Sequence, residues 1–253
     1  MPSAAPDRLV ERFRAARRDP GLAVLAGFHA LTHALRFGAD VLDVAAADVD
    51  VLERLAATLA PDLAGAFAGR AEVVAPEVLA TLAPRVPATR VVALARRPAV
   101  DVAAVLGEAS MPVVLLEDPR HLGNVGAVVR VAAAAGASAV LTTGARDPWD
   151  PAALRGSAGL HFALPVARLD DASPLPADAP PLVALDPDGE PLRAGALPAR
   201  VVLAFGTERH GLGDALLARA ATRVAIPMRP GVSSLNLATA VAVVLYAGGL
   251  ART

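Results

Sequence analysis

The chain has 253 residues, a formal net charge of −1 at pH 7 and no cysteine, so it can bury one large core or two modest ones but cannot form disulfides or thiolate metal sites. The near balance of charges excludes a strongly basic field over the whole protein, so any contact with nucleic acid has to use a local patch of arginines. No apolar run reaches the roughly 20 residues of a membrane span, and the N-terminus lacks the apolar core of a signal peptide, which together predict a cytoplasmic protein without a membrane segment.

Residues 7–98 alternate apolar runs with helical patterns, which predicts a small α/β domain. The arginine-rich segment 7–18 is interpreted as a surface helix with Asp7 as its N-cap, and its arginines fit a solvated face and an RNA-contacting patch equally well. His29 and His33 have the spacing of metal ligands, but no HExxH pattern accompanies them and we expect no metal. Strands are predicted at 22–27, 41–46, 71–74 and 89–97, and helices over 28–37, 48–60 and 76–82.

Residues 96–110 lack a clear period and carry Pro98 and Gly107, so a linker is predicted at 99–110. A second alternation then occupies 111–253, and its continuously apolar runs are typical of a parallel sheet covered on both faces. Strands are predicted at 113–117, 139–142, 162–166, 182–186, 201–205 and 224–226, helices over 124–135, 151–158, 212–221 and 234–247, and an exposed loop over 170–181.

Rare residues coincide with the motifs of this second region. The chain has no lysine or glutamine, and its two asparagines and one isoleucine are Asn124, Asn236 and Ile226. The dominance of Ala, Val, Leu, Arg, Pro and Gly suggests a coding sequence biased toward GC-rich codons, which removes Asn and Ile wherever another residue serves. We infer that these three residues are retained for their chemistry.

Each of three loops follows an apolar strand, at the sheet edge where open α/β folds bind ligands. The first leads through Gly123 and Gly126, which let backbone approach a ligand or partner closely. The second, FGTERHG (205–211), can hold a ligand's polar edge with exposed N–H groups. The third leads into an apolar terminal helix, for which Ser233 or Ser234 is the expected N-cap. Taken alone, the first loop is better explained by helix capping, and Glu208 in the second fits a structural role and a functional role equally well. A terminal core helix explains the third loop except for Ser234 and Asn236.

Together the segments NVGAVVR (124–130), FGTERHGL (205–212) and IPMRPGVSSLNLATAVAVVLY (226–246) resemble, in order and spacing, the motifs of the SpoU (TrmH-type) RNA methyltransferases of the SPOUT superfamily. RGSAGLHFALPV (155–166) also fits that family, and residues 22–41 resemble the ribosomal-protein-like domain that often precedes it. The resemblance implies a small ribosomal-protein-like α/β domain for binding RNA over 7–98 and a SPOUT domain over 111–253. The SPOUT domain would have a parallel sheet and a trefoil knot, which pattern reasoning alone would not propose.

The resemblance also implies an activity: transfer of a methyl group from S-adenosylmethionine to a ribose 2′-hydroxyl of RNA, by a homodimer. Ribosomal RNA is favoured over transfer RNA because this type of N-terminal domain occurs in ribosomal-RNA enzymes. The alternatives are a transfer-RNA 2′-O-methyltransferase and a non-catalytic RNA-binding module that keeps the fold. An ordinary dinucleotide-dependent enzyme is disfavoured because the GxGxxG fingerprint is absent.

Residues that match the family's motifs take its roles by resemblance. The catalytic residues implied are Arg130, Asn124, Glu208, Ser234 and Asn236, and the cofactor-binding residues are Gly206, Ile226, Leu235 and Met228. Because a guanidinium stays protonated, we expect Arg130 to anchor a phosphate or stabilise alkoxide charge, not to act as a base. The chain departs from the family pattern at Thr207, Arg209 and Ala238. Candidate phosphate contacts are Arg12, Arg17, Arg18, Arg96 and Arg97.

Overall fold

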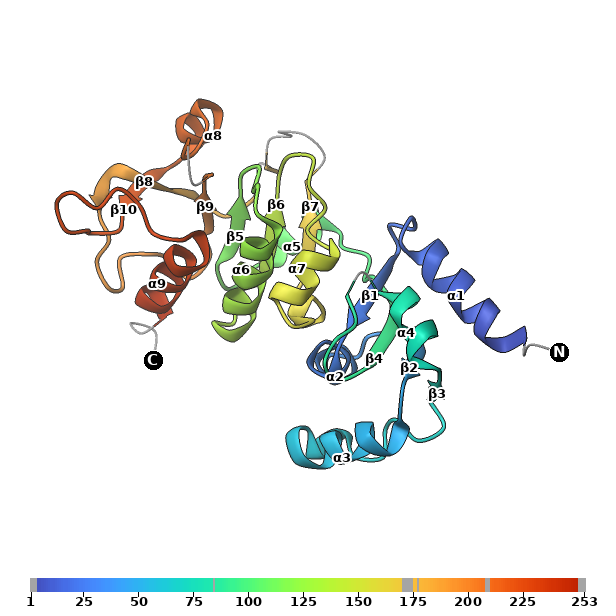
Figure 1. Ribbon diagram of the computed structural model, residues 1–253. Helices are drawn as coiled ribbons and strands as arrows, with labels where there is room; N and C mark the ends of the chain where they lie inside the picture. The colour runs from blue at the N-terminus through green and yellow to red at the C-terminus, as the bar shows by residue number, and fades with distance from the viewer. Residues whose placement is uncertain (1–3, 84, 170–174, 177, 208–209, 250–253) are drawn as a thin grey trace. The chain divides into compact units, whose positions relative to one another are not determined.

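The protein folds into two compact α/β units, as a computed structural model shows (Figure 1). The structure describes residues 4–83, 85–169, 175–176, 178–207 and 210–249. The N-terminal unit consists of residues 1–99 and, from much later in the chain, 158–163, and the C-terminal unit consists of 100–157 and 164–253. The N-terminal unit is therefore built from two separate pieces of the sequence.

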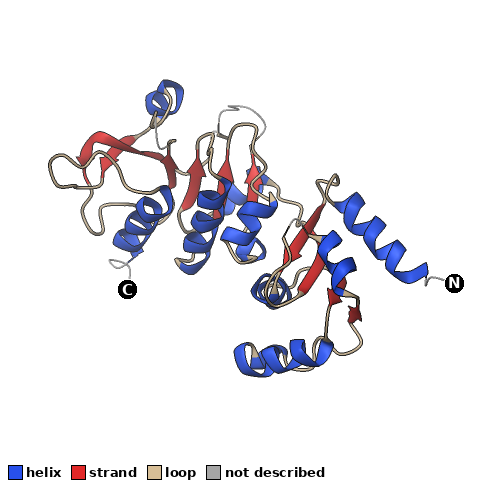
Figure 2. Ribbon diagram, in the orientation of Figure 1, coloured by secondary structure: helices blue, strands red, loops and turns tan. Residues whose placement is uncertain are grey.

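The N-terminal unit is a mixed sheet with helices around it (Figure 2). Its strands lie in the order β1-β4-β2-β3, with β4 antiparallel to β1 and β2, and β2 parallel to β3. The strands are β1 (Leu22–Ala26), β2 (Val41–Ala46), β3 (Ala71–Val73) and β4 (Val91–Arg96), and the helices are α1 (Ala4–Ala16), α2 (Phe28–Arg36), α3 (Val49–Leu59) and α4 (Pro76–Leu82), with short 3-10 turns η1 (Pro61–Leu63) and η2 (Leu160–Phe162).

Helix α1 packs against the sheet through an apolar stripe that includes the fully buried Phe13. It begins at Ala4, so Asp7 lies within the first turn and the prediction of Asp7 as N-cap is wrong. On the sheet side of this helix Arg12 pairs with Asp43 at 2.7 Å. Burial raises the pKa of the Asp43 carboxyl, and the charge of Arg12 lowers it in part.

The later piece of the N-terminal unit packs directly on α2. The Nδ1–H of His33 donates to the Ala158 carbonyl oxygen at 2.7 Å. Gly159 has φ +79°, and a Cβ placed there would lie 2.6 Å from the carbonyl oxygen of Ala30. Only glycine fits so close an approach in a left-handed conformation. A strand was predicted at 162–166, but this piece forms the turn η2, and the strand starts only at Val166.

The C-terminal unit is a parallel sheet in the order β10-β8-β9-β5-β6-β7, which confirms the predicted fold class. The central pair β5–β9 is in register from Val113–Val202 to Leu116–Phe205. Its strands are β5 (Val113–Leu116), β6 (Ala139–Thr142), β7 (Val166–Arg168), β8 (Leu182–Pro191), β9 (Val202–Phe205) and β10 (Thr222–Ala225), and its helices are α5 (Val102–Glu108), α6 (Leu122–Ala134), α7 (Pro151–Gly156), α8 (Asp214–Arg219) and α9 (Leu237–Gly249). The trefoil knot stays a prediction.

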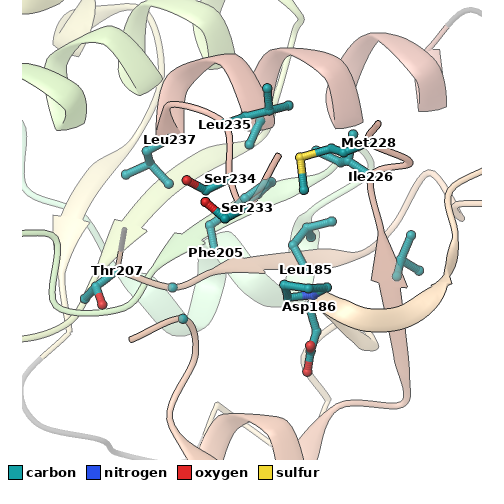
Figure 3. A pocket seen from close by; sticks show the side chains of 15 residues that line it. Leu185, Asp186, Phe205, Thr207, Ile226, Met228, Ser233, Ser234, Leu235 and Leu237 are labelled. Atoms are coloured by element: carbon teal, nitrogen blue, oxygen red, sulfur yellow. The ribbon is translucent and has the colours of Figure 1, made fainter. Parts of the chain in front are cut away.

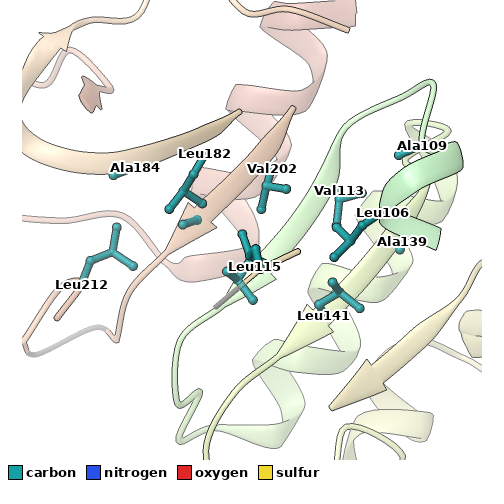
Figure 4. Packing of buried hydrophobic residues seen from close by; sticks show 12 residues of the cluster. Leu106, Ala109, Val113, Leu115, Ala139, Leu141, Leu182, Ala184, Val202 and Leu212 are labelled. Carbon is teal, nitrogen blue, oxygen red and sulfur yellow. The ribbon is translucent and has the colours of Figure 1, made fainter. Parts of the chain in front are cut away.

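One face of this sheet is covered by α5, although α5 falls inside the predicted linker (Figure 4). The Asp101 side chain caps α5 by accepting from Ala104 N at 3.1 Å. Leu106 is fully buried and packs with Val113 and Leu141 of the sheet. Residues 102–108 are therefore part of the core. Seven residues are two turns of helix, too few to show a clear period in the sequence.

The other face is covered by α6, with α7 and α9 packed beside it (Figure 1). A Cβ added at Gly126 would lie 2.1 Å from the carbonyl oxygen of Ala153 and 2.8 Å from Gly156 Cα, so α6 and α7 touch backbone to backbone there. Gly126 thus serves helix packing, where a ligand or partner was predicted to approach. At Gly123 the space around a Cβ is open.

Two further features concern the whole described chain. None of its helices has the length and apolar character needed to cross a bilayer. Within the same residues, histidines and carboxylates form no cluster suited to hold a metal ion. Half of the predicted exposed loop at 170–181 lies outside the described residues. In the described half Leu175 is buried and packs in the core of the C-terminal unit, so the prediction of an exposed loop is wrong there.

Candidate functional site

A pocket of about 280 Å³ lies in the C-terminal unit, between strand β8, the ends of β9 and β10 and the start of α9 (Figure 3). Its walls come from segments that are far apart in the sequence but adjacent in the sheet, because β8 lies between β9 and β10. The lining residues are Leu185, Asp186, Pro187, Phe205, Gly206, Thr207, Gly211, Val224, Ile226, Met228, Ser233, Ser234, Leu235, Leu237 and Ala240.

The pocket contains every residue predicted to bind the cofactor. Gly206, Ile226, Leu235 and Met228 all line it, as does Ser234 from the catalytic set. The β8 side of the pocket, Leu185 to Pro187, was not predicted. The sequence does carry a signal there, because the apolar run at the start of β8 is followed by polar residues, as in the other three loops. That β8 lies beside those loops depends on the strand order, which the local sequence does not show.

The glycine-rich loop after β9 is closed on itself. Thr207 and Gly211 exchange two backbone hydrogen bonds of 3.0 Å, and His210 N donates to Thr207 Oγ1 at 3.1 Å. A Cβ at Gly206 would lie 2.0 Å from the carbonyl carbon of Gly211, so the closure requires glycine. The predicted residues Glu208 and Arg209 lie outside the described residues.

Asn124 and Asn236 meet although they are 112 positions apart, with Asn236 Nδ2 donating to Asn124 Oδ1 at 3.2 Å. The other amide atom of Asn236, Oδ1, accepts from Ala238 N at 3.0 Å and Thr239 N at 3.4 Å. Asn236 therefore caps α9, and the prediction that Ser233 or Ser234 caps it is wrong. Asparagine suits this position because an ionised aspartate would accept from the backbone but could not donate to Asn124.

Arg130 stands apart from the pocket. It lies on an exposed face of α6 and is not among the lining residues. Among the residues that the structure describes, its guanidinium has neither a hydrogen-bond nor an ion-pair partner. A residue with this exposure contributes little to folding, so its chemistry is available to a molecule from outside.

Most arginines predicted to contact RNA phosphates have partners inside the N-terminal unit. Besides the pair of Arg12 with Asp43, Arg17 donates to the carbonyl oxygen of Thr81, Arg96 pairs with Asp40 at 3.1 Å, and Arg97 donates to the Leu22 carbonyl oxygen at 2.7 Å. Arg96 and Asp40 are each more than half exposed, so this pair is weak and a phosphate can compete for the guanidinium.

The family model described as "SpoU rRNA Methylase family" matches residues 111–246, more than half of the chain, and the chain belongs to this family. It is 37% identical over 137 residues to an uncharacterized tRNA/rRNA methyltransferase of Synechocystis sp., which is 52% of this chain and 49% of that protein. It is 33% identical over 166 residues to the 23S rRNA (adenosine(1067)-2′-O)-methyltransferase of Streptomyces laurentii, with coverage of 62% and 61%. The chain thus spans about half to three fifths of these relatives.

The fold is that of the SpoU methyltransferase AviRb from Streptomyces viridochromogenes, which was crystallised with AdoMet. The TM-score is 0.77 over 99% of both chains, at 24% sequence identity. The likeness extends over both units and so includes the region before the family match. It confirms the mixed α/β fold.

Proposed function

We propose that the chain is an S-adenosylmethionine-dependent methyltransferase that acts on a ribose 2′-hydroxyl of ribosomal RNA in the cytoplasm. The observation that carries the proposal is the pocket, which gathers the second and third family motifs around one space. Asn124 of the first motif is bonded to Asn236, which lies in the chain between the lining residues Leu235 and Leu237. Membership of the family and the 2′-O-methyltransferase named among its relatives support this reaction.

The pocket's composition fits the methyl donor. Phe205, Ile226 and Leu235 offer apolar walls for a purine, and the hydroxyls of Thr207 and Ser234 offer hydrogen bonds. Its volume is near the lower end of the about 300–1,000 Å³ of small-molecule sites. In the proposal Gly206, Ile226, Leu235 and Met228 hold the donor, largely through backbone and apolar contacts. When bound, S-adenosylmethionine supplies a methyl group made electrophilic by a sulfonium.

The protein's own residues then have to hold the ribose in place and favour the charged form of its 2′-oxygen. The permanent positive charge of Arg130 suits it to bind a phosphate or to stabilise charge on that oxygen. Asn124 and Asn236 fix each other's amides, so they can orient a ribose or the donor. The Ser234 hydroxyl, which faces the pocket, is a further polar contact, and Glu208 keeps the role that the family resemblance implies.

The proposal includes a homodimer. Arg130 does not line the pocket of its own chain, so a second copy offers a way to bring this side chain to a site. Helix α9 presents Thr239, Val243 and Tyr246 at helical spacing on an exposed face, and Tyr246 is 47% exposed. An apolar face of this kind is suited to contact another chain. The resemblance to homodimeric enzymes supports the same arrangement.

Methyl transfer tests the proposal directly. The protein is incubated with S-adenosylmethionine carrying a labelled methyl group and with total RNA from a strain that lacks this gene, and the RNA is then fractionated and digested to nucleosides. We expect label in a 2′-O-methylnucleoside of the ribosomal fraction. Label in the transfer-RNA fraction would make transfer RNA the substrate in place of ribosomal RNA. If no RNA is labelled and the protein does not bind the donor, an RNA-binding module explains the chain better.

A further inference from the structure

Glu117 joins two loops of the candidate site, although it is not among the residues predicted for that site. It follows strand β5 directly, and its backbone N–H donates to the Phe205 carbonyl oxygen at 2.9 Å. Its side chain reaches beyond the sheet, where Oε2 accepts from the backbone N–H of Gly213 at 2.6 Å. Gly213 is the last residue of the glycine-rich loop, before α8.

The contact is close. A Cβ at Gly213 would lie 3.0 Å from Glu117 Oε1, so a larger residue there would shift the carboxylate by a few tenths of an ångström. A carboxylate that accepts from a backbone N–H forms a charge-assisted bond, stronger than a bond between neutral groups. The N-cap of α8 is glycine and no N-cap side chain holds this end of the loop, so the Glu117 carboxylate supplies the side-chain hydrogen bond there.

The loop is consequently held at both ends. At its start the Thr207–Gly211 bridge and the close approach of Gly206 to Gly211 fix the backbone, and at its end Glu117 fixes Gly213. Gly206, Thr207 and Gly211 of this loop line the pocket. Glu117 does not line the pocket, so it can act on a bound molecule only through the loop.

We propose that Glu117 is a positioning residue for the methyl donor: its carboxylate holds the glycine-rich loop in the conformation that binds S-adenosylmethionine. This inference rests on the proposed function of the pocket. It differs from a purely structural role, in which Glu117 would stabilise the fold without altering donor affinity. It also differs from a catalytic role, in which Glu117 would change the rate once donor and RNA are both bound.

The test compares Glu117→Ala and Glu117→Gln in the full chain with the control Glu108→Gln, whose glutamate is exposed at the end of α5 in the same unit. Donor affinity is measured by titration calorimetry with S-adenosylmethionine in the absence of RNA. For Glu117→Ala we expect the dissociation constant to rise about tenfold, as for the loss of one hydrogen bond to a charged group. Glu117→Gln keeps an acceptor without the charge, so its dissociation constant should lie between those of the parent protein and Glu117→Ala. Glu108→Gln should bind the donor as tightly as the parent protein.

Two further readouts separate the alternatives. At saturating donor, kcat and the KM for RNA should stay within about twofold of the parent, because the loop is then occupied. Unfolding followed by Trp149 fluorescence identifies any variant that fails to fold. If Glu117→Ala does not fold, the donor affinity of Glu117→Gln decides between the alternatives. Unchanged donor affinity in folded variants, or a fall in kcat with unchanged affinity, overturns the inference. If the parent protein itself binds no donor, the proposed function fails first.

Discussion

Replacing Gly126 by alanine should destabilise the C-terminal unit, although alanine favours a helix by about 1 kcal/mol over glycine. The added Cβ would lie 2.1 Å from the Ala153 carbonyl oxygen, more than an ångström short of the about 3.5 Å at which nonbonded atoms rest. Both contacting groups are backbone, so no side-chain rotation relieves the clash and α6 has to move away from α7. Overpacking of this kind costs about 1–3 kcal/mol, and we expect the upper half of that range as a net loss.

The same helix supplies a matched control. Gly123→Ala adds the same methyl group where nothing lies within 4 Å, so its stability should be unchanged or slightly raised. Urea unfolding is followed by the fluorescence of Trp149, the single tryptophan, which is buried next to α7 and donates to the Val166 carbonyl oxygen at 3.0 Å. With an m-value of about 2 kcal/mol/M, the midpoint for Gly126→Ala should fall by about 1 M. Equal midpoints for the two variants would refute the close helix approach.

Further predictions concern the site and the N-terminal unit. Arg130→Ala should lower methyl transfer at least about 100-fold while the calorimetric donor affinity is kept, and normal turnover would remove Arg130 from the reaction. Asn236→Ala should cost about 1 kcal/mol of stability through the lost cap. Asn236→Asp keeps an oxygen that can cap the helix, so its thermal stability should be retained while its activity is lost. Equal thermal stability of the two variants would contradict the capping role. Because burial raises the pKa of Asp43, its contribution to stability is present below about pH 4, where the carboxyl is protonated, and declines as pH rises through the raised value. Asp43→Asn should remove that decline in urea midpoints measured from about pH 4 to about pH 7, and an unchanged pH dependence would speak against it.

The sequence predicted those elements whose signal is local. Strand β6 (Ala139–Thr142) and helix α4 (Pro76–Leu82) were predicted with the bounds that the structure has. The strand is a short, mostly apolar run, and the helix is a periodic segment with a clear start at Pro76. Helix α5 was missed because so short a segment shows no period, and its burial depends on a sheet formed by residues that follow it.

The candidate site was predictable in its parts but not in its assembly. Of the rare residues, Ile226 lines the pocket, and the structure joins Asn124 and Asn236 by a hydrogen bond. Which residue caps α9 could not be read from the sequence, since serine and asparagine are both good caps and only the second amide atom of Asn236 favours it. The β8 wall was missed because strand order is not a local property.

The discontinuous N-terminal unit has a consequence for anyone who cuts this chain into pieces. A fragment ending at residue 99 would lack residues 158–163 and with them the carbonyl oxygen that His33 binds and the glycine that lies against Ala30. A fragment starting at residue 100 would carry those same residues without the helix that covers them. Truncations and chimaeras that treat the two halves of the sequence as interchangeable modules would therefore leave one half incomplete, and an exchange of N-terminal units between relatives has to move both pieces together.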